Sequence, residues 1–104
     1  MARYDVYANP IKSEAKHTPY LVDLQNDYLD SIETRLVAPL HSLNFYQHQS
    51  ERVRQIFEIE SQTVVLDIAE LASLPKTLLK KKVANLTAEQ HKIREALDTI
   101  FGAY

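Results

Sequence analysis

The arginine and histidine side chains are the groups in this chain best suited to acid–base chemistry on a phosphodiester. They are Arg3, Arg35, Arg52, Arg54, Arg94, His17, His41, His48 and His91. Such chemistry needs an arginine beside an acidic residue or a histidine, and no spacing among these residues marks a pair. The sequence therefore favours a function in which the protein itself makes and breaks no covalent bond.

Metal binding finds little support. Asp23, Asp27 and Asp30 lack the glycine pivot of a calcium loop and are expected to be surface carboxylates in turns. His41 and His48 stand seven positions apart in a segment without a clear pattern, so we attribute their spacing to chance. Cysteine is absent, which excludes a disulfide framework and a thiolate zinc site. We predict no metal and no cofactor.

Composition and charge narrow the class of protein. A chain of 104 residues, 45% hydrophobic and 25% charged, is expected to fold as one domain over residues 1–104. Its net charge of -2 does not suit binding to nucleic acid, so no direct nucleic-acid contact is expected. The run Lys80 to Lys82 after Lys76 is interpreted as a solvated loop. No stretch suits a secretion signal or a membrane span, which predicts a cytoplasmic protein without membrane contact.

Alternating apolar and polar residues predict a short strand over residues 4–7, and residues 19–24 and 35–40 are also strand-like. Pro39 predicts that the third of these strands lies at a sheet edge or ends there. Residues 55–59 and 63–67 are typical of a hairpin, although the connector 60–62 has no Asn-Gly or Asp-Gly. Residues 41–54 give no clear pattern. A further apolar stretch runs from residue 69 to Pro75.

The clearest predicted element is a helix over residues 87–101. Thr87 and Gln90 fit a capping box at its start. An apolar stripe at helical spacing follows and is expected to pack into the core: Ile93, Ala96, Leu97, Ile100 and Phe101. Five or so short strands followed by one helix predict an α+β fold, a small bent sheet or open barrel with the helix packed on it.

The run Pro-Tyr-Leu-Val-Asp-Leu-Gln-Asn-Asp-Tyr-Leu-Asp at residues 19–30, followed by Thr-Arg-Leu-Val-Ala-Pro-Leu at 34–40, resembles the CcdB toxin family. That family shows a strand of the type Phe-Val-Asp-Val-Gln-Ser-Asp and then one ending Val-Ile-Pro-Leu. Residues 70–75, Glu-Leu-Ala-Ser-Leu-Pro, resemble the family's Met-Ala-Ser-Val-Pro, and the likeness continues through residues 83–86 and the terminal helix. It covers essentially the whole chain.

The resemblance implies a fold, an activity and partners. The fold is an SH3-like, strongly bent antiparallel sheet or partial barrel with a C-terminal helix, assembled as a homodimer. The activity is that of a toxin of a type II toxin–antitoxin system, which binds the A subunit of DNA gyrase and traps the cleaved-DNA complex. A partly disordered CcdA-like antitoxin wraps the toxin and silences it. No enzymatic activity is implied.

The resemblance also suggests site residues. The family's C-terminal Trp-Gly-Ile, which anchors gyrase, falls on Gly102, Ala103 and Tyr104, so the tryptophan is replaced by glycine. Other gyrase-facing positions correspond to Asn26, Tyr28, Leu29 and Asp98, of which the first three lie beside the matching Gln25 and Asp27. At the helix end, Ile100 and Phe101 are expected beside the dimer axis.

Two alternatives stay open. The missing tryptophan is compatible with a harmless homologue that keeps the dimer and the antitoxin site but no longer poisons gyrase. The same fold class also contains messenger-RNA-cleaving toxins resembling MazF and Kid, although no arginine pair with an acid or histidine is marked in this sequence.

Overall fold

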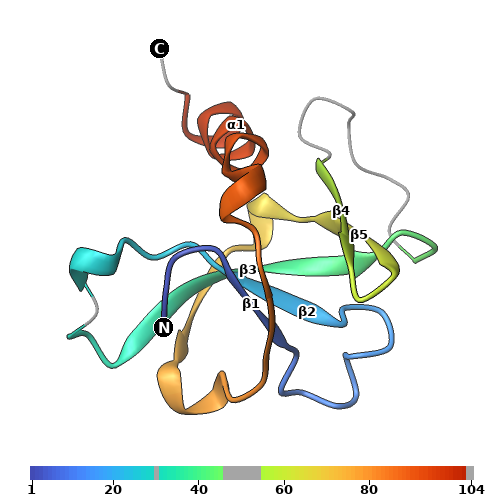
Figure 1. Ribbon diagram of the computed structural model, residues 1–104, viewed down its shortest axis with the longest axis horizontal. Helices are drawn as coiled ribbons and strands as arrows, with labels where there is room; N and C mark the ends of the chain where they lie inside the picture. The colour runs from blue at the N-terminus through green and yellow to red at the C-terminus, as the bar shows by residue number, and fades with distance from the viewer. Residues whose placement is uncertain (30, 46–54, 103–104) are drawn as a thin grey trace.

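The computed structural model describes residues 1–29, 31–45 and 55–102. These residues form an antiparallel sheet in the order β4-β5-β3-β2-β1-β7, with β6 paired to β3 off this path (Figure 1). The strands are β1 Asp5–Ala8, β2 Tyr20–Asp23, β3 Thr34–Ser42, β4 Gln55–Ile59, β5 Gln62–Leu66, β6 Ala72–Pro75 and β7 Lys82–Asn85. Short 3-10 turns are η1 Asp27–Leu29, η2 Ile68–Glu70, η3 Lys76–Leu78 and η4 Thr87–Glu89, and α1 Gln90–Phe101 is the α-helix. The predicted bent sheet with a C-terminal helix is confirmed.

Strand β3 organises the sheet because it pairs with three other strands. Its first half pairs with β6, its second half with β5, and its middle with β2 on the opposite side. The prediction that Pro39 marks an edge or an end is therefore wrong. The Pro39 carbonyl accepts a hydrogen bond from the Asp67 N–H at 3.0 Å. The Pro39 nitrogen therefore also faces the side of β3 that pairs with β6 and β5. Pairing with β6 ends at Val37 and pairing with β5 begins at Leu40, so no donor is needed from Pro39.

Both faces of the sheet carry apolar clusters, as alternation along the strands requires. One face, with Val22 and Leu40, packs against Ile93 and Ala96 of α1. On the other face lies a smaller cluster, which contains residues of β1, β2, β3 and the segment after β6: Tyr7, Leu21, Val37 and Leu79, with Leu74 packed against them. The sheet curls into a half-barrel, and the segment that runs from β6 through η3 to Leu79 covers this second face through Leu74 and Leu79.

The predicted hairpin is confirmed as β4 and β5, with a shorter turn than expected. Ile59 pairs with Gln62, which leaves only Glu60 and Ser61 in the connection. Both have positive φ, 50° and 65°, the backbone that a primed two-residue turn requires. The Tyr20 hydroxyl donates to Glu60 Oε1 at 2.8 Å and holds this turn against β2.

Strands β6 and β7 were not among the predicted strands. The apolar stretch that ends at Pro75 forms β6, and the lysine run leads directly into β7. Interpreting the whole run as a solvated loop is therefore wrong for Lys82, which opens β7 and whose Nζ lies 3.1 Å from Asp5 Oδ1. Lys80 and Lys81 are exposed, as expected.

The predicted helical span is confirmed as η4 followed by α1, but the capping box is wrong. Neither η4 nor α1 has a side-chain hydrogen bond from its N-cap residue. The N–H of Thr87 instead donates to Asn85 Oδ1 at 2.8 Å. The last turn of the stripe does not pack on the protein's own sheet, since Ile100 is 36% and Phe101 69% exposed. No helix in the described part of the chain is long and apolar enough to cross a membrane.

Candidate binding surface

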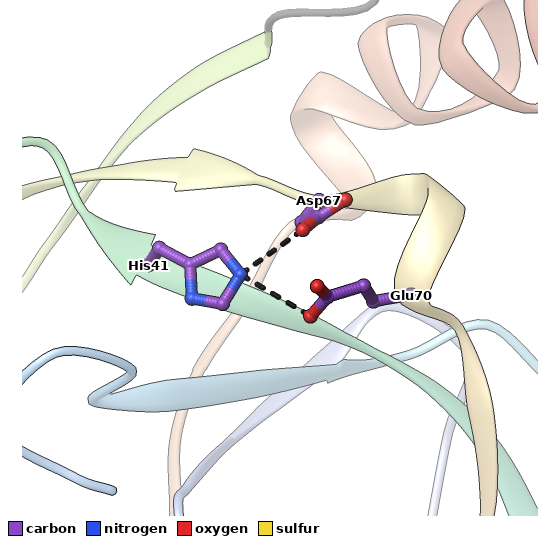
Figure 2. A group of neighbouring side chains, drawn as sticks. All are labelled: His41, Asp67 and Glu70. Atoms are coloured by element: carbon purple, nitrogen blue, oxygen red, sulfur yellow. Dashed lines mark hydrogen bonds and ion pairs between the residues drawn. The ribbon is translucent and has the colours of Figure 1, made fainter. Parts of the chain in front are cut away.

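The chemistry-bearing residues singled out by type have structural partners. His41 lies on β3 with its Nε2 3.2 Å from Asp67 Oδ2 (Figure 2). His48, which stands seven positions after His41, lies outside the described residues, as does Asp30. The expectation of a surface carboxylate in a turn is wrong for Asp23, which ends β2 with no exposed surface, whereas Asp27 opens η1 with its side chain 61% exposed. Both approach the guanidinium of Arg35. Arg35 is fully buried, so it is not available to contact an RNA backbone.

The three site residues predicted near η1 share one exposed turn. The Tyr28 N–H donates to Asn26 Oδ1 at 3.0 Å, and the Leu29 N–H donates to the Asn26 carbonyl at 2.9 Å. These bonds fold the chain so that the Tyr28 side chain projects into solvent, with 94% of its surface exposed. Leu29 is 48% and Ile32 44% exposed, so the turn presents an aromatic ring beside aliphatic side chains.

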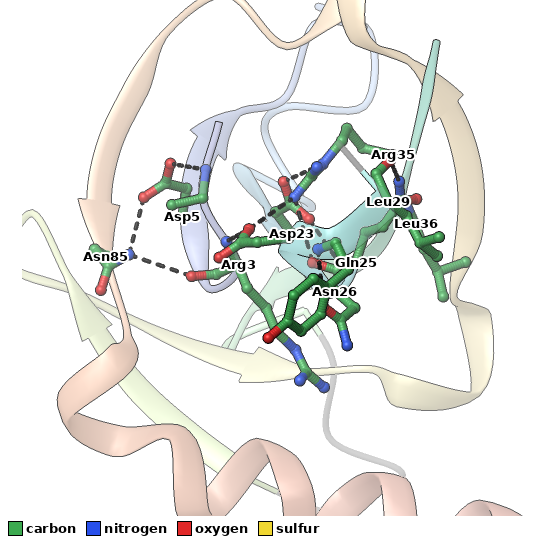
Figure 3. Close-up of polar contacts among 12 residues, drawn as sticks. Arg3, Asp5, Asp23, Gln25, Asn26, Leu29, Arg35, Leu36 and Asn85 are labelled. Carbon is green, nitrogen blue, oxygen red and sulfur yellow. Dashed lines mark hydrogen bonds and ion pairs between the residues drawn. The ribbon is translucent and has the colours of Figure 1, made fainter. Parts of the chain in front are cut away.

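A buried ion pair lies beneath this turn. The Arg35 Nε donates to Asp23 Oδ2 at 2.7 Å, and both side chains have no exposed surface (Figure 3). A second guanidinium nitrogen of Arg35 donates to the Gln25 carbonyl at 3.3 Å and lies 3.7 Å from Asp27 Oδ1. Arg35 therefore connects the β2 end and the start of the turn to β3.

Gln25 fixes the turn from both ends of its amide. Its Nε2 donates to the Leu29 carbonyl at 3.0 Å, while its Oε1 accepts from the Leu36 N–H at 3.1 Å (Figure 3). The Gln25 N–H donates to Asp23 Oδ1 at 2.9 Å. The first bond closes the turn on itself and the other two connect it to β3 and β2, so the backbone carrying Tyr28 is ordered by the chain's own contacts, which reduces the entropy lost on binding.

The N-terminal segment adds a second set of contacts. The Arg3 N–H donates to Asp27 Oδ1 at 2.9 Å, which ties the N-terminus to η1. Nearby, Asp5 accepts from the Ala2 N–H and from Asn85 Nδ2, both at 2.9 Å. The network thus reaches from the turn to Asn85 at the end of β7, whose Oδ1 accepts from the Thr87 N–H.

The two buried carboxyl groups of this network respond differently to their surroundings. Burial raises the pKa of Asp23, and the hydrogen bond from Arg35 only partly opposes it. Burial also penalises the Asp5 carboxylate, but hydrogen bonds from Asn85 and Ala2 and the Lys82 ammonium outweigh it and lower the Asp5 pKa. Asp5 is therefore the more firmly ionised of the two.

The second predicted segment is the end of α1. Gly102 closes the helix in the left-handed conformation, with φ 67°, and its N–H donates to the Asp98 carbonyl at 2.8 Å. Asp98 is exposed beside it. Ile100 and Phe101 add exposed apolar surface at this end. Ala103 and Tyr104 lie outside the described residues.

The structure does not bring all predicted site residues together. Asn26, Tyr28 and Leu29 lie at η1, at the left of Figure 1, whereas Asp98 and Gly102 lie at the end of α1, at its top. Within one chain they form separate segments of surface. One partner would contact both only by spanning that separation or by meeting more than one copy of the chain.

Sequence reasoning missed the residues that support the turn. Arg35 belongs to the predicted strand over residues 35–40 and is a candidate for phosphodiester chemistry, but neither prediction includes its ion pair with Asp23 or the Gln25 contacts. A signal was present, because Arg35 and Val37 have the same parity on β3, as do Asp23 and Leu21 on β2. An arginine on an apolar strand face needs a buried carboxylate, and the antiparallel partner strand supplies one.

A curled antiparallel half-barrel with a C-terminal helix places this protein in the SH3-like α+β class. The comparison with family models is more specific. A model described as "CcdB protein" matches residues 3–102 of the 104-residue chain. The chain therefore belongs to the CcdB family, the toxins of toxin–antitoxin systems.

Proposed function

We propose that this protein is a gyrase poison that binds the A subunit of DNA gyrase and traps the cleaved-DNA complex, acting in the cytoplasm as a homodimer without enzymatic activity of its own. Family membership supports this partner, because CcdB proteins are gyrase poisons. The proposed contact surface consists of Asn26, Tyr28 and Leu29 on the turn and Asp98, Gly102, Ala103 and Tyr104 at the helix end. A CcdA-like antitoxin is the proposed silencing partner.

The observation that carries the proposal is an exposed aromatic ring on a turn fixed by buried contacts. Tyr28 is 94% exposed, yet its turn is held by Gln25 and by the buried Arg35–Asp23 pair. Tyrosine is enriched among residues that dominate binding energy, and a fixed backbone reduces the entropy lost on association. Such a turn has no evident role in the protein's own core.

Gyrase assays with purified protein test the proposal. The protein should inhibit supercoiling and increase gyrase-cleaved DNA, and Tyr28→Ala should weaken gyrase binding by about tenfold or more, the effect of losing roughly 1.4 kcal/mol. Leu29→Ala and Leu78→Ala form a matched pair, since these leucines are 48% and 41% exposed but lie on different turns, η1 and η3. Only Leu29→Ala should weaken binding. Gyrase left untouched at micromolar protein would refute the proposal.

A second candidate is a harmless homologue that retains the dimer and binds a CcdA-like antitoxin. The specific observation in its favour is Gly102, which serves as the helix cap where the family carries its tryptophan anchor. Expression without antitoxin separates the two candidates, because a gyrase poison arrests growth and the harmless homologue does not. Incubation with total RNA tests the third possibility, a ribonuclease, which would leave cleaved RNA.

A further inference from the structure

Three side chains away from the η1 turn converge where β3, β5 and η2 meet. His41 Nε2 lies 3.2 Å from Asp67 Oδ2 and 3.6 Å from Glu70 Oε2, and Figure 2 shows all three pointing toward one another. One ligand atom from each residue lies within 4.8 Å of the other two. Within residues 1–29, 31–45 and 55–102, this is the one such group of histidine and acidic side chains.

The backbone produces this convergence. His41 pairs with Val65 of β5, and Asp67 follows directly after that strand. Asp67 and Glu70 are joined across η2 by a hydrogen bond from the Glu70 N–H to the Asp67 carbonyl at 3.2 Å. Side chains three residues apart on a 3-10 turn point the same way. Both carboxylates are therefore directed at the imidazole by the sheet and the turn.

The spacing of the ligand atoms suits a metal ion. Two ligand atoms each about 2.0–2.2 Å from a tetrahedral zinc ion stand roughly 3.3–3.6 Å apart. The two distances from His41 Nε2, 3.2 and 3.6 Å, are close to that separation. Small movements of the Glu70 side chain would complete the geometry, since this side chain is 63% exposed.

The other nitrogen of His41 is already oriented. His41 Nδ1 lies 2.7 Å from Thr18 Oγ1, so an Nδ1–H can donate to this hydroxyl while a bound ion replaces the Nε2 proton that otherwise donates to Asp67 Oδ2. A metal-binding histidine characteristically donates its second ring N–H to such a partner, which sets the tautomer and the ring orientation. Thr18 would have this positioning role.

An entry path and space for solvent ligands are also present. His41, Glu70 and Thr18 line a pocket of about 250 Å³, together with Asn9 and Glu14. Water in this pocket could complete the coordination shell beside three protein ligands, the arrangement of an open zinc site.

We propose that His41, Asp67 and Glu70 form a binding site for a divalent cation of the zinc class. One imidazole and two carboxylates suit Zn²⁺ or Co²⁺, whereas Ca²⁺ and Mg²⁺ prefer oxygen ligands alone. The ligands join β3 to the β5–η2 junction, so a bound ion stabilises the folded chain by mass action. The proposal is independent of gyrase binding.

Calorimetric titration and thermal unfolding with Zn²⁺, Co²⁺, Ca²⁺ and Mg²⁺ test the site on the intact protein. Zn²⁺ should bind with one ion per chain and raise Tm by about 5 °C at concentrations well above Kd. Co²⁺ should give visible absorption bands of a low-coordinate ion. Ca²⁺ and Mg²⁺ at the same concentration should leave Tm unchanged; a shift equal to that with Zn²⁺ would contradict an imidazole ligand.

Glu70→Gln is the decisive variant because its exposed position leaves folding intact, whereas changes at the buried Asp67 risk unfolding. Zn²⁺ affinity should fall at least tenfold in Glu70→Gln and more in His41→Gln. His91→Gln and Glu95→Gln, at exposed positions of α1, are matched controls and should bind as the parent does. The proposal fails if the parent binds no Zn²⁺, if Glu70→Gln retains full affinity, or if His91→Gln loses it.

Discussion

Arg35 and Asp23 form a buried ion pair between adjacent strands, with 2.7 Å between Nε and Oδ2 and no exposed surface on either side chain. The pair lies on the face of the sheet opposite α1, beneath the turn that carries Tyr28. A buried pair of this kind is costly to desolvate, so its clearest effect is to specify position. Here it specifies where the η1 turn begins.

Removing one partner should be strongly destabilising. Arg35→Met leaves the Asp23 carboxylate buried without its guanidinium, and we expect a loss of about 3–5 kcal/mol in the free energy of unfolding. Urea titration measures it. The double variant Asp23→Leu with Arg35→Met should recover a substantial part of the loss, since no charge is then left buried. A single-variant cost below about 1 kcal/mol would contradict the buried pairing.

Gln25→Ala should loosen the turn more than it destabilises the fold. The Gln25 side chain bonds the turn at Leu29 and β3 at Leu36, so the loss of both bonds is expected to cost about 1–2 kcal/mol and to speed amide exchange at residues 26–29. Hydrogen exchange followed by mass spectrometry reads out this segment. If exchange there matches the parent while gyrase binding falls, Gln25 acts by contact and the positioning role is wrong.

Alkaline pH should destabilise the protein through two buried tyrosines. Burial, followed by the charges of Asp5 and Asp23, raises the pKa of Tyr7 to about 12, and burial with the Glu60 hydrogen bond raises that of Tyr20 to about 12. Each contributes stability that is fully present below the unfolded pKa of about 10 and is lost as pH rises through the folded pKa.

Tyr20→Phe isolates one of these contributions. At neutral pH the variant loses the bond to Glu60, about 0.5–1.5 kcal/mol, but its stability should fall less than that of the parent between about pH 10 and 12. Urea unfolding at several pH values, with tyrosinate absorbance as a second readout, measures the difference. Parallel curves for parent and variant would show that Tyr20 ionises equally well in both states.

Much of the fold could be predicted because local patterns and long-range contacts agree. The alternation in β4 and the helical stripe of Ile93 and Ala96 each report one buried face, and both faces are buried in the structure. Pro39 misled because its missing donor suggested an edge. Pro39 is accommodated because β3 pairs with β6 before this residue and with β5 after it. This arrangement depends on strands far apart in the sequence, so the local pattern does not reveal it.

The supporting contacts of the site were harder to predict for the same reason. Arg35 and Asp23 are twelve residues apart, and His41 and Asp67 are twenty-six apart. Nothing local in either segment requires its partner. The capping box shows the converse case, because the Thr87 to Gln90 pattern was present but Asn85 satisfied the Thr87 N–H first.

Gly102→Trp tests whether the family's anchor can be restored. A Cβ at position 102 meets nothing within 4 Å, so only the left-handed backbone opposes a side chain there, at a cost of about 1 kcal/mol. Gly102→Ala carries the same strain without the ring and is the matched control. Gyrase affinity should rise by about thirtyfold in the tryptophan variant relative to the alanine variant, the effect of about 2 kcal/mol. Equal affinities would show that the anchor has moved elsewhere.

The exposed end of α1 should mediate self-association. Phe101 is 69% and Ile100 36% exposed in the single chain, although both continue the stripe whose earlier members are buried. A second copy would cover them, since two-fold dimers pair one patch with itself. Sedimentation velocity should show a dimer for the parent and a monomer for Phe101→Asp, because burying an unpaired carboxylate is costly. Leu78→Asp, at another exposed apolar position, should stay dimeric; if it dissociates equally, or if Phe101→Asp remains a dimer, the interface lies elsewhere.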